Sequence, residues 1–213
     1  MTDLIFIRHG RTTWNEEGRF QGHLNSDLNE VGLQQAAALG KRFAHKTFAH
    51  VYSSDLGRAY QTAQALTESH ELSIEKDPAL RERCMGVFQG CTSSEITAAH
   101  SESWRLFLER DPDYRMPDGE SINDVLMRAH GFLERVRQKH EGQCVAAVTH
   151  GGWIRVLMKD LLGLDQRRVA PFKVFNTSVH HLRWVEDKWW VFSMGDVAHL
   201  DESLLRTSTP YVL

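Results

Sequence analysis

Short apolar runs alternate with amphipathic segments over most of the chain. Residues 4–7, 51–53 and 143–149 are largely apolar, which is typical of strands buried on both faces of a sheet. Residues 71–77 alternate between apolar and polar side chains and stop before Pro78, which predicts another strand. The pattern therefore predicts four strands separated by longer segments.

The longer segments show apolar residues at helical spacing. Asn29 precedes the first such stripe and is a candidate N-cap, and Ser54 or Asp55 is the candidate cap of the second. Ser121 and Asp124 have the spacing of a capping box in front of the longest stripe. Helices are therefore predicted over residues 29–43, 54–70, 121–140 and 150–163.

Alternating strands and helices predict an α/β protein with a mostly parallel sheet between two helical layers, a three-layer α/β/α sandwich. Residues 179–185 and 189–192 predict a hairpin that adds an antiparallel edge. The length fits a single domain over residues 1–213. The least regular stretch, 83–119, is expected to form a flap or small cap with one helix near 104–108.

The composition and charge of the chain limit the kinds of molecule that we expect it to bind. The formal net charge is −3, so the chain has no general basic field for nucleic acid or a membrane surface. The cysteines, Cys84, Cys91 and Cys144, form no CxxC pair, and no apolar stretch approaches 18 residues. We expect a cytoplasmic protein with reduced thiols and no signal peptide, acting as a monomer or a homodimer.

Cationic and titratable side chains follow three of the predicted strands. Arg8 and His9 follow the first strand, Arg58 opens the helix after the second, and His150 follows the strand at 143–149. Ligands of open α/β sheets bind beyond the carboxyl ends of the strands, so we expect these groups to converge. Guanidinium groups and helix N-termini suit a phosphate dianion and disfavour a metal cation. The sequence therefore predicts a phosphate site without a metal.

These residues lie in motifs that resemble those of the histidine phosphatase superfamily. The motifs are, in chain order, LIFIRHGRTTWN, SSDLGRAYQTA, LRERCMGVFQG, PDGES and VTHGGWIR, and the resemblance spans roughly residues 3 to 180. They are most similar to the cofactor-dependent phosphoglycerate mutase branch, especially its short bacterial members. The resemblance implies a phosphoglycerate mutase-like fold and an enzyme that acts on a small phosphorylated substrate.

The resemblance also implies roles for individual residues. His9 would be the nucleophile that becomes phosphohistidine, and Glu82 would be the general acid. Arg8, Arg58 and His150 would hold the phosphoryl oxygens. Independently of the resemblance, a dianion nearby favours the protonated ring, so we expect His150 to be a cation. The implied substrate-binding residues are Thr12, Asn15, Gln21, Gly22 and Gly151.

The residues alone leave the choice of acid open. Glu82 lies in an ordinary charged run and, apart from the resemblance, cannot be distinguished from Glu95 or Glu120. A carboxyl group can protonate the leaving oxygen only in its neutral form. Glu82 can therefore act as the acid only if burial or the charge of the phosphate favours its protonated form.

Departures from the family pattern bear on the reaction. Arg11 stands where many relatives have glutamate, and Tyr60 stands where short bacterial relatives often have arginine. The stretch 91–120 contains no lysine and several acids, so it suits a bisphosphorylated sugar acid poorly. We predict a phosphatase first and a mutase that requires 2,3-bisphosphoglycerate second. A non-catalytic phospho-ligand binding protein is disfavoured because His9 and Glu82 are both present.

Overall fold

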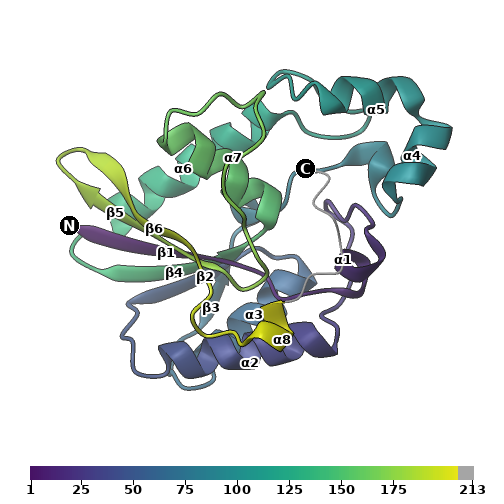
Figure 1. The fold of residues 1–213 in the computed structure, drawn as a ribbon. Coiled ribbons are helices and arrows are strands. Elements are labelled where there is room, and N and C mark those ends of the chain that lie inside the picture. The colour runs from purple at the N-terminus through teal and green to yellow at the C-terminus, as the bar shows by residue number, and fades with distance from the viewer. Residues whose placement is uncertain (206–213) are drawn as a thin grey trace.

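The computed structural model describes residues 1–205 and is built on a six-stranded sheet. The strand order is β3-β2-β4-β1-β5-β6 (Figure 1). The first four strands of this order run parallel, and β5 and β6 form the antiparallel edge. The strands are β1 (Thr2–Arg8), β2 (His50–Ser53), β3 (Ile74–Lys76), β4 (Cys144–Thr149), β5 (Val179–Val185) and β6 (Lys188–Asp196).

Helices cover both faces of the sheet, which confirms the predicted sandwich. On one face, α2 (Glu30–Phe43) and α3 (Gly57–Thr67) bury their apolar stripes against β1, β2 and β4. On the other face, α6 (Ile122–Lys139) and α7 (Gly151–Leu161) do the same. The short helices are α1 (Thr13–Glu17) and α8 (Glu202–Leu205), and the 3-10 turns are Pro78–Leu80 and Gly86–Phe88.

The register of the sheet aligns the carboxyl ends of three neighbouring strands, β1, β4 and β2. Arg8 pairs with Thr149 across β1 and β4, and Ser53 pairs with Val148 across β2 and β4. The next residue of each strand therefore emerges at the same edge of the sheet. This alignment brings His9 and His150 together from distant parts of the sequence.

The helix caps agree with the sequence except at α3. Asn29 accepts a hydrogen bond from Gly32 N, and Ser121 forms the predicted capping box with Asp124. At α3 the N-cap residue is Leu56, with no side-chain cap, so the expectation of Ser54 or Asp55 is wrong. Both side chains are engaged elsewhere, Ser54 with an imidazole at the site described below and Asp55 with a guanidinium.

The irregular stretch 83–119 forms a small cap with its own apolar cluster. It carries two helices, α4 (Ser93–Ala99) and α5 (Ser101–Leu108), where the sequence predicted one (Figure 1). The first helix is too short to show a periodic stripe, and its start is fixed by a capping box between Thr92 and Glu95. The cap buries Met85, Phe88, Ile96, Trp104, Phe107 and Met116.

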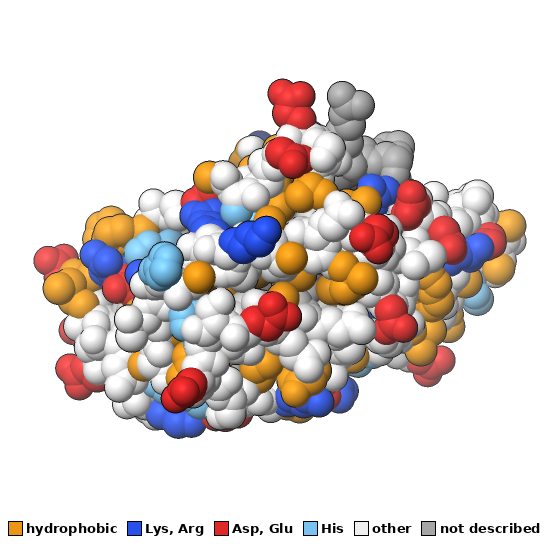
Figure 2. Space-filling view, turned by 90° about the horizontal axis from the view of Figure 1, so that it is seen from below, with side chains coloured by type: hydrophobic (Ala, Val, Ile, Leu, Met, Phe, Trp, Pro, Cys, Tyr) orange, Lys and Arg blue, Asp and Glu red, His pale blue; other side chains and the backbone are white. Residues whose placement is uncertain are grey.

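The exposed charges, the thiols and the helices bear on partners and location. Figure 2 shows a face on which acidic and basic side chains are interspersed, without a continuous basic area among the described residues. Cys84, Cys91 and Cys144 form no disulfide. None of the helices within residues 1–205 is long and apolar enough to cross a membrane.

Candidate active site

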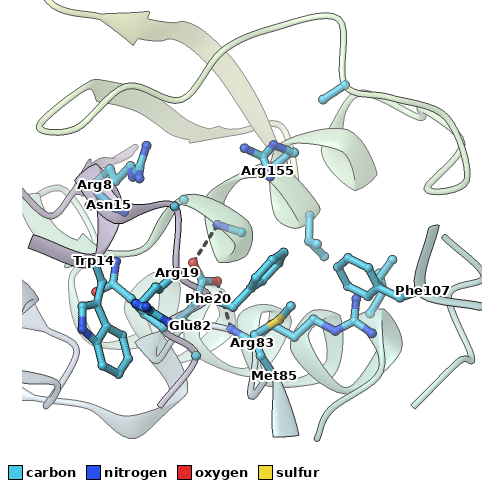
Figure 3. Close-up of a pocket in the computed structure, with 18 of the residues that line it drawn as sticks. Arg8, Trp14, Asn15, Arg19, Phe20, Glu82, Arg83, Met85, Phe107 and Arg155 are labelled. Atoms are coloured by element: carbon cyan, nitrogen blue, oxygen red, sulfur yellow. Dashed lines mark hydrogen bonds between the residues drawn. The ribbon is translucent and has the colours of Figure 1, made fainter. Parts of the chain in front are cut away.

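A cavity of about 310 Å³ opens where the carboxyl edge of the sheet faces the cap. Figure 3 shows Arg8 and Asn15 on one side of it, Phe107 on the other, and Glu82 and Phe20 between them. Its walls include His9, Arg58, Gly151 and Gly152. The ends of β1 and β4 and the first turn of α3 therefore contribute to one site, as the sequence predicted.

His9 is held as a neutral imidazole. Its Nδ1 lies 2.7 Å from Gly10 O and must donate the proton, because a carbonyl oxygen only accepts. This tautomer places the lone pair on Nε2. Burial and the charges of Arg58 and Arg8 lower the pKa of His9 well below its usual value. A neutral ring with an available Nε2 is the form that can attack phosphorus.

Arg58 is fully buried and supports the loop that closes the site. Its Nη atoms donate to Leu24 O and Gly22 O, both at 2.8 Å. Its Nε donates to His150 Nδ1 at 3.2 Å. Burial lowers the pKa of Arg58 to about 10, so the group remains a cation at neutral pH. Arg58 thus supplies charge and also positions Gly22.

Arg8 presents an unsatisfied donor. Its Nη1 donates to Val174 O at 2.7 Å, whereas its buried Nε has no hydrogen-bond partner. A Cβ on Gly151 would lie 3.0 Å from this Nε, so a side chain at position 151 would crowd it. Gln21 Oε1 is the other buried polar side-chain atom without a partner among the described residues. Arg8 and Gln21 both line the cavity, so a molecule bound there could supply the missing partners.

His150 is neutral in this arrangement, which corrects the expectation of a cation. Its Nδ1 accepts from Arg58 Nε, so its Nε2 donates to Ser54 Oγ at 2.8 Å. Burial and the charge of Arg58 lower the pKa of His150 well below its usual value. The ring centroid of His150 is 5.1 Å from that of His9. His150 is nevertheless not among the residues that line the cavity.

The environments of the three candidate acids differ. Glu82 lines the cavity, and its carboxylate accepts from Gly152 N at 2.9 Å and Trp153 N at 3.0 Å, at the start of α7. Glu95 caps α4, and Glu120 pairs with an arginine of α6; neither lines the cavity. Glu82 is thus the carboxylate placed to meet a substrate.

The other implied substrate-binding residues divide into two groups. Asn15, Gln21, Gly22 and Gly151 line the cavity. Thr12 does not line it: its hydroxyl accepts from Asn15 N at 3.1 Å and caps α1. Thr12 therefore fixes the start of the helix that carries Asn15. The structure gives no support for direct substrate binding by Thr12.

Three further side chains that the sequence analysis did not identify support the site. Asn176 Nδ2 donates to His9 O at 3.0 Å, and Thr62 Oγ1 accepts from Gly10 N at 3.0 Å. Ser54 is the partner of His150. Ser54 follows β2 as His9 follows β1, a positional signal that could have identified it. Asn176 lies in an irregular loop and offers no such signal.

Three buried histidines should make the fold sensitive to acid. Burial lowers the pKa values of His9, His150 and His180, the last to about 4, with Arg58 adding to the effect at His9 and His150. The unfolded chain takes up these protons below pH about 6.5, whereas the folded chain does not. Each group that stays neutral in the folded chain therefore costs on the order of 1 kcal/mol of stability for every pH unit below that value.

Urea unfolding in phosphate-free buffer at pH 7, 6 and 5 measures this loss. We expect the free energy of unfolding to fall progressively with pH, and H180Q to reduce the slope. A free energy of unfolding that is constant between pH 7 and 5 would show that these rings are protonated in the folded state.

Known proteins share this architecture. A profile of the histidine phosphatase superfamily (branch 1) matches residues 4–197. The chain is 38% identical over 205 residues to phosphoglycerate mutase-like protein 4 of Arabidopsis thaliana, covering 94% of this chain and 88% of that protein. It is 37% identical to the metal-independent phosphoserine phosphatase of the same plant, covering 94% and 84%. The structure of Bacillus stearothermophilus YhfR matches with a TM-score of 0.89 at 34% identity, covering 93% and 99%.

Proposed function

The chain belongs to the histidine phosphatase superfamily (branch 1), and on this premise we propose a phosphomonoester hydrolase that works through a phosphohistidine. The observation that carries the proposal is the neutral imidazole of His9, whose Nε2 holds a lone pair, in a cavity that Arg8 also lines. The cavity therefore offers both a nucleophile and an anion-binding guanidinium whose Nε has no partner.

In the first step, His9 Nε2 attacks phosphorus as the ester P–O bond breaks. Arg8 and Arg58 stabilise the charge on the equatorial oxygens, aided by the N-terminus of α7. Glu82, in its neutral form, protonates the departing oxygen. The products of this step are the free alcohol and phosphorylated His9.

In the second step, water attacks the phosphohistidine and the P–N bond breaks. Glu82, now a carboxylate, takes the proton from the attacking water. Inorganic phosphate leaves, and His9 returns to its neutral state. Each residue thereby recovers its starting protonation state after one turnover.

The proposed substrate is a small phosphorylated metabolite, as the name of the phosphoserine phosphatase relative supports. The described residues contain no cluster of three His, Cys, Asp or Glu side chains that could hold a metal. We propose that hydrolysis is metal-independent and needs no cofactor, in the cytoplasm, by a monomer or a homodimer.

A mutase is the second candidate. The relative named phosphoglycerate mutase-like protein 4 supports it, as do arginines that line the cavity beyond Arg8 and Arg58. Such a reaction would need 2,3-bisphosphoglycerate to phosphorylate His9. The cap again disfavours it, because Arg83 and Arg110 are its only cations on the cavity wall.

A substrate panel tests the proposal. We expect phosphate release from phenyl phosphate and from several phosphorylated metabolites, with unchanged rates after EDTA treatment. A parallel mutase assay with and without 2,3-bisphosphoglycerate should show slower phosphoglycerate interconversion than hydrolysis. Loss of activity with EDTA, restored by a divalent metal, would contradict the metal-independent mechanism.

A further inference from the structure

The part of the cavity far from His9 is lined by cations that the proposed phosphoryl transfer does not use. Among the described lining residues, every charged side chain is Arg or Lys except Glu82, although the chain has a net charge of −3. The cations not assigned to the phosphate site include Arg110, Arg155, Lys159 and Arg168. We call these four residues the distal cluster.

The distal cluster is a spatial group centred on Lys159. Lys159 lines the same cavity as Arg110 and Arg155, and burial lowers the pKa of Lys159, with Asp165 opposing the shift and the two arginines adding to it. Lys159 Nζ donates to Arg168 O at 2.6 Å, which fixes the loop that carries Arg168 beside α7. Asp165 is the opposing charge nearby, and its carboxylate accepts from Arg167 N. Lys159 Nζ also donates to Gln166 O at 2.7 Å, so its two hydrogen bonds go to backbone carbonyls and not to a carboxylate.

Helix α7 provides a scale for the separation between the proposed phosphate site and the distal cluster. Gly152, at its start, binds the carboxylate of Glu82 beside the proposed phosphate site. Lys159 lies seven residues later on the same face of the helix, about 10 Å along its axis. A carboxylate attached to a three-carbon phosphate ester would lie too close to phosphorus to span this distance.

An apolar stretch separates the two charged ends. Phe20, Met85, Phe107 and Leu108 line the cavity on the side of the cap, and Val156 lines it from α7. Figure 3 shows Phe20 and Met85 between Glu82 and Phe107. Such a wall favours an apolar segment in the bound molecule.

We propose that the preferred substrate is an elongated phosphomonoester whose leaving group has an apolar middle and ends in a second anionic group at the distal cluster. The second anion, a carboxylate or a phosphate, lies about 10 Å from phosphorus. This inference rests on the proposed phosphatase function. It adds a chain-length preference and a charge preference that a general phosphatase would not have.

A series of ω-carboxyalkyl phosphates of increasing length tests the proposal, each compared with its own methyl ester. We expect the ratio of kcat/KM for acid over ester to peak at about tenfold when the carboxylate lies about 10 Å from phosphorus. The ratio should decline for shorter and longer chains and at high salt. A parallel series that ends in a second phosphate shows which anion is preferred.

The R110Q/R168Q double variant removes two charges of the distal cluster. Arg168 holds Lys159 through its backbone carbonyl, so this substitution leaves that hydrogen bond in place. We expect the acid-to-ester ratio to fall towards one at every length. The matched control is R167Q, because Arg167 is exposed, does not line the cavity and faces Asp111 at 3.5 Å. R167Q should keep the wild-type ratio.

The outcomes separate this inference from the function on which it rests. If the wild-type protein does not hydrolyse phenyl phosphate, the proposed function fails. If it hydrolyses phenyl phosphate but shows a ratio near one at every length, the distal cluster has no role in substrate choice. A ratio that peaks in the wild type and survives in R110Q/R168Q would place the second anion elsewhere.

Discussion

H9N is expected to reduce phenyl phosphate hydrolysis by at least about 10⁴-fold, because it removes the Nε2 lone pair that attacks phosphorus. The asparagine amide can still donate to Gly10 O, as His9 Nδ1 does at 2.7 Å. The arginines remain, so the variant should still bind inorganic phosphate. Steady-state kinetics and phosphate binding by calorimetry measure the two effects separately.

The control is H180N, which replaces another buried histidine outside the cavity. His180 bonds Ser178 Oγ at 3.0 Å and takes no part in the proposed reaction. H180N should change the thermal midpoint more than the turnover per folded molecule. Equal losses of turnover in both folded variants would mean that His9 acts by supporting the structure.

E82Q is expected to lower hydrolysis of alkyl phosphates by about 10³-fold and of nitrophenyl phosphate by about tenfold or less. An alkoxide is a poor leaving group and needs the proton that Glu82 supplies, whereas a nitrophenolate leaves without it. The glutamine can still accept from Trp153 N, as Glu82 does at 3.0 Å. Rates over a series of leaving groups measure the dependence.

E120Q controls for the structural part of this effect. Glu120 accepts from Cys84 N at 2.8 Å and pairs with Arg128 at 3.1 Å, outside the cavity. Its replacement should lower stability and affect all leaving groups alike. If E82Q also affects aryl and alkyl esters equally, Glu82 only caps the N-terminus of α7.

Much of the scaffold of the site follows from the sequence. Apolar runs mark β1, β2 and β4, and parallel strands end at a common edge of the sheet. The sequence alone therefore predicts the convergence of four side chains, Arg8, His9, Arg58 and His150. The choice of Glu82 over Glu95 and Glu120 needed the resemblance to the family. The structure supplies the physical difference, since only Glu82 faces the cavity.

The remaining features depend on packing that periodicity does not show. The protonation of His150 follows from a hydrogen bond with Arg58, 92 residues away in the chain. Asn176 reaches His9 O from an irregular loop. The cations that line the cavity away from the phosphate site include residues of α7 and of the loop after it, whereas the sequence analysis considered only the stretch 91–120.

The most direct test of the central claim is to identify the phosphorylated residue. Rapid-quench mass spectrometry of the wild-type protein with a fast phosphomonoester should find an acid-labile, base-stable phosphoryl group on His9, absent from H9N. Phosphate on a serine or cysteine, or turnover without any phosphoenzyme under conditions that trap phosphohistidine, would contradict the account.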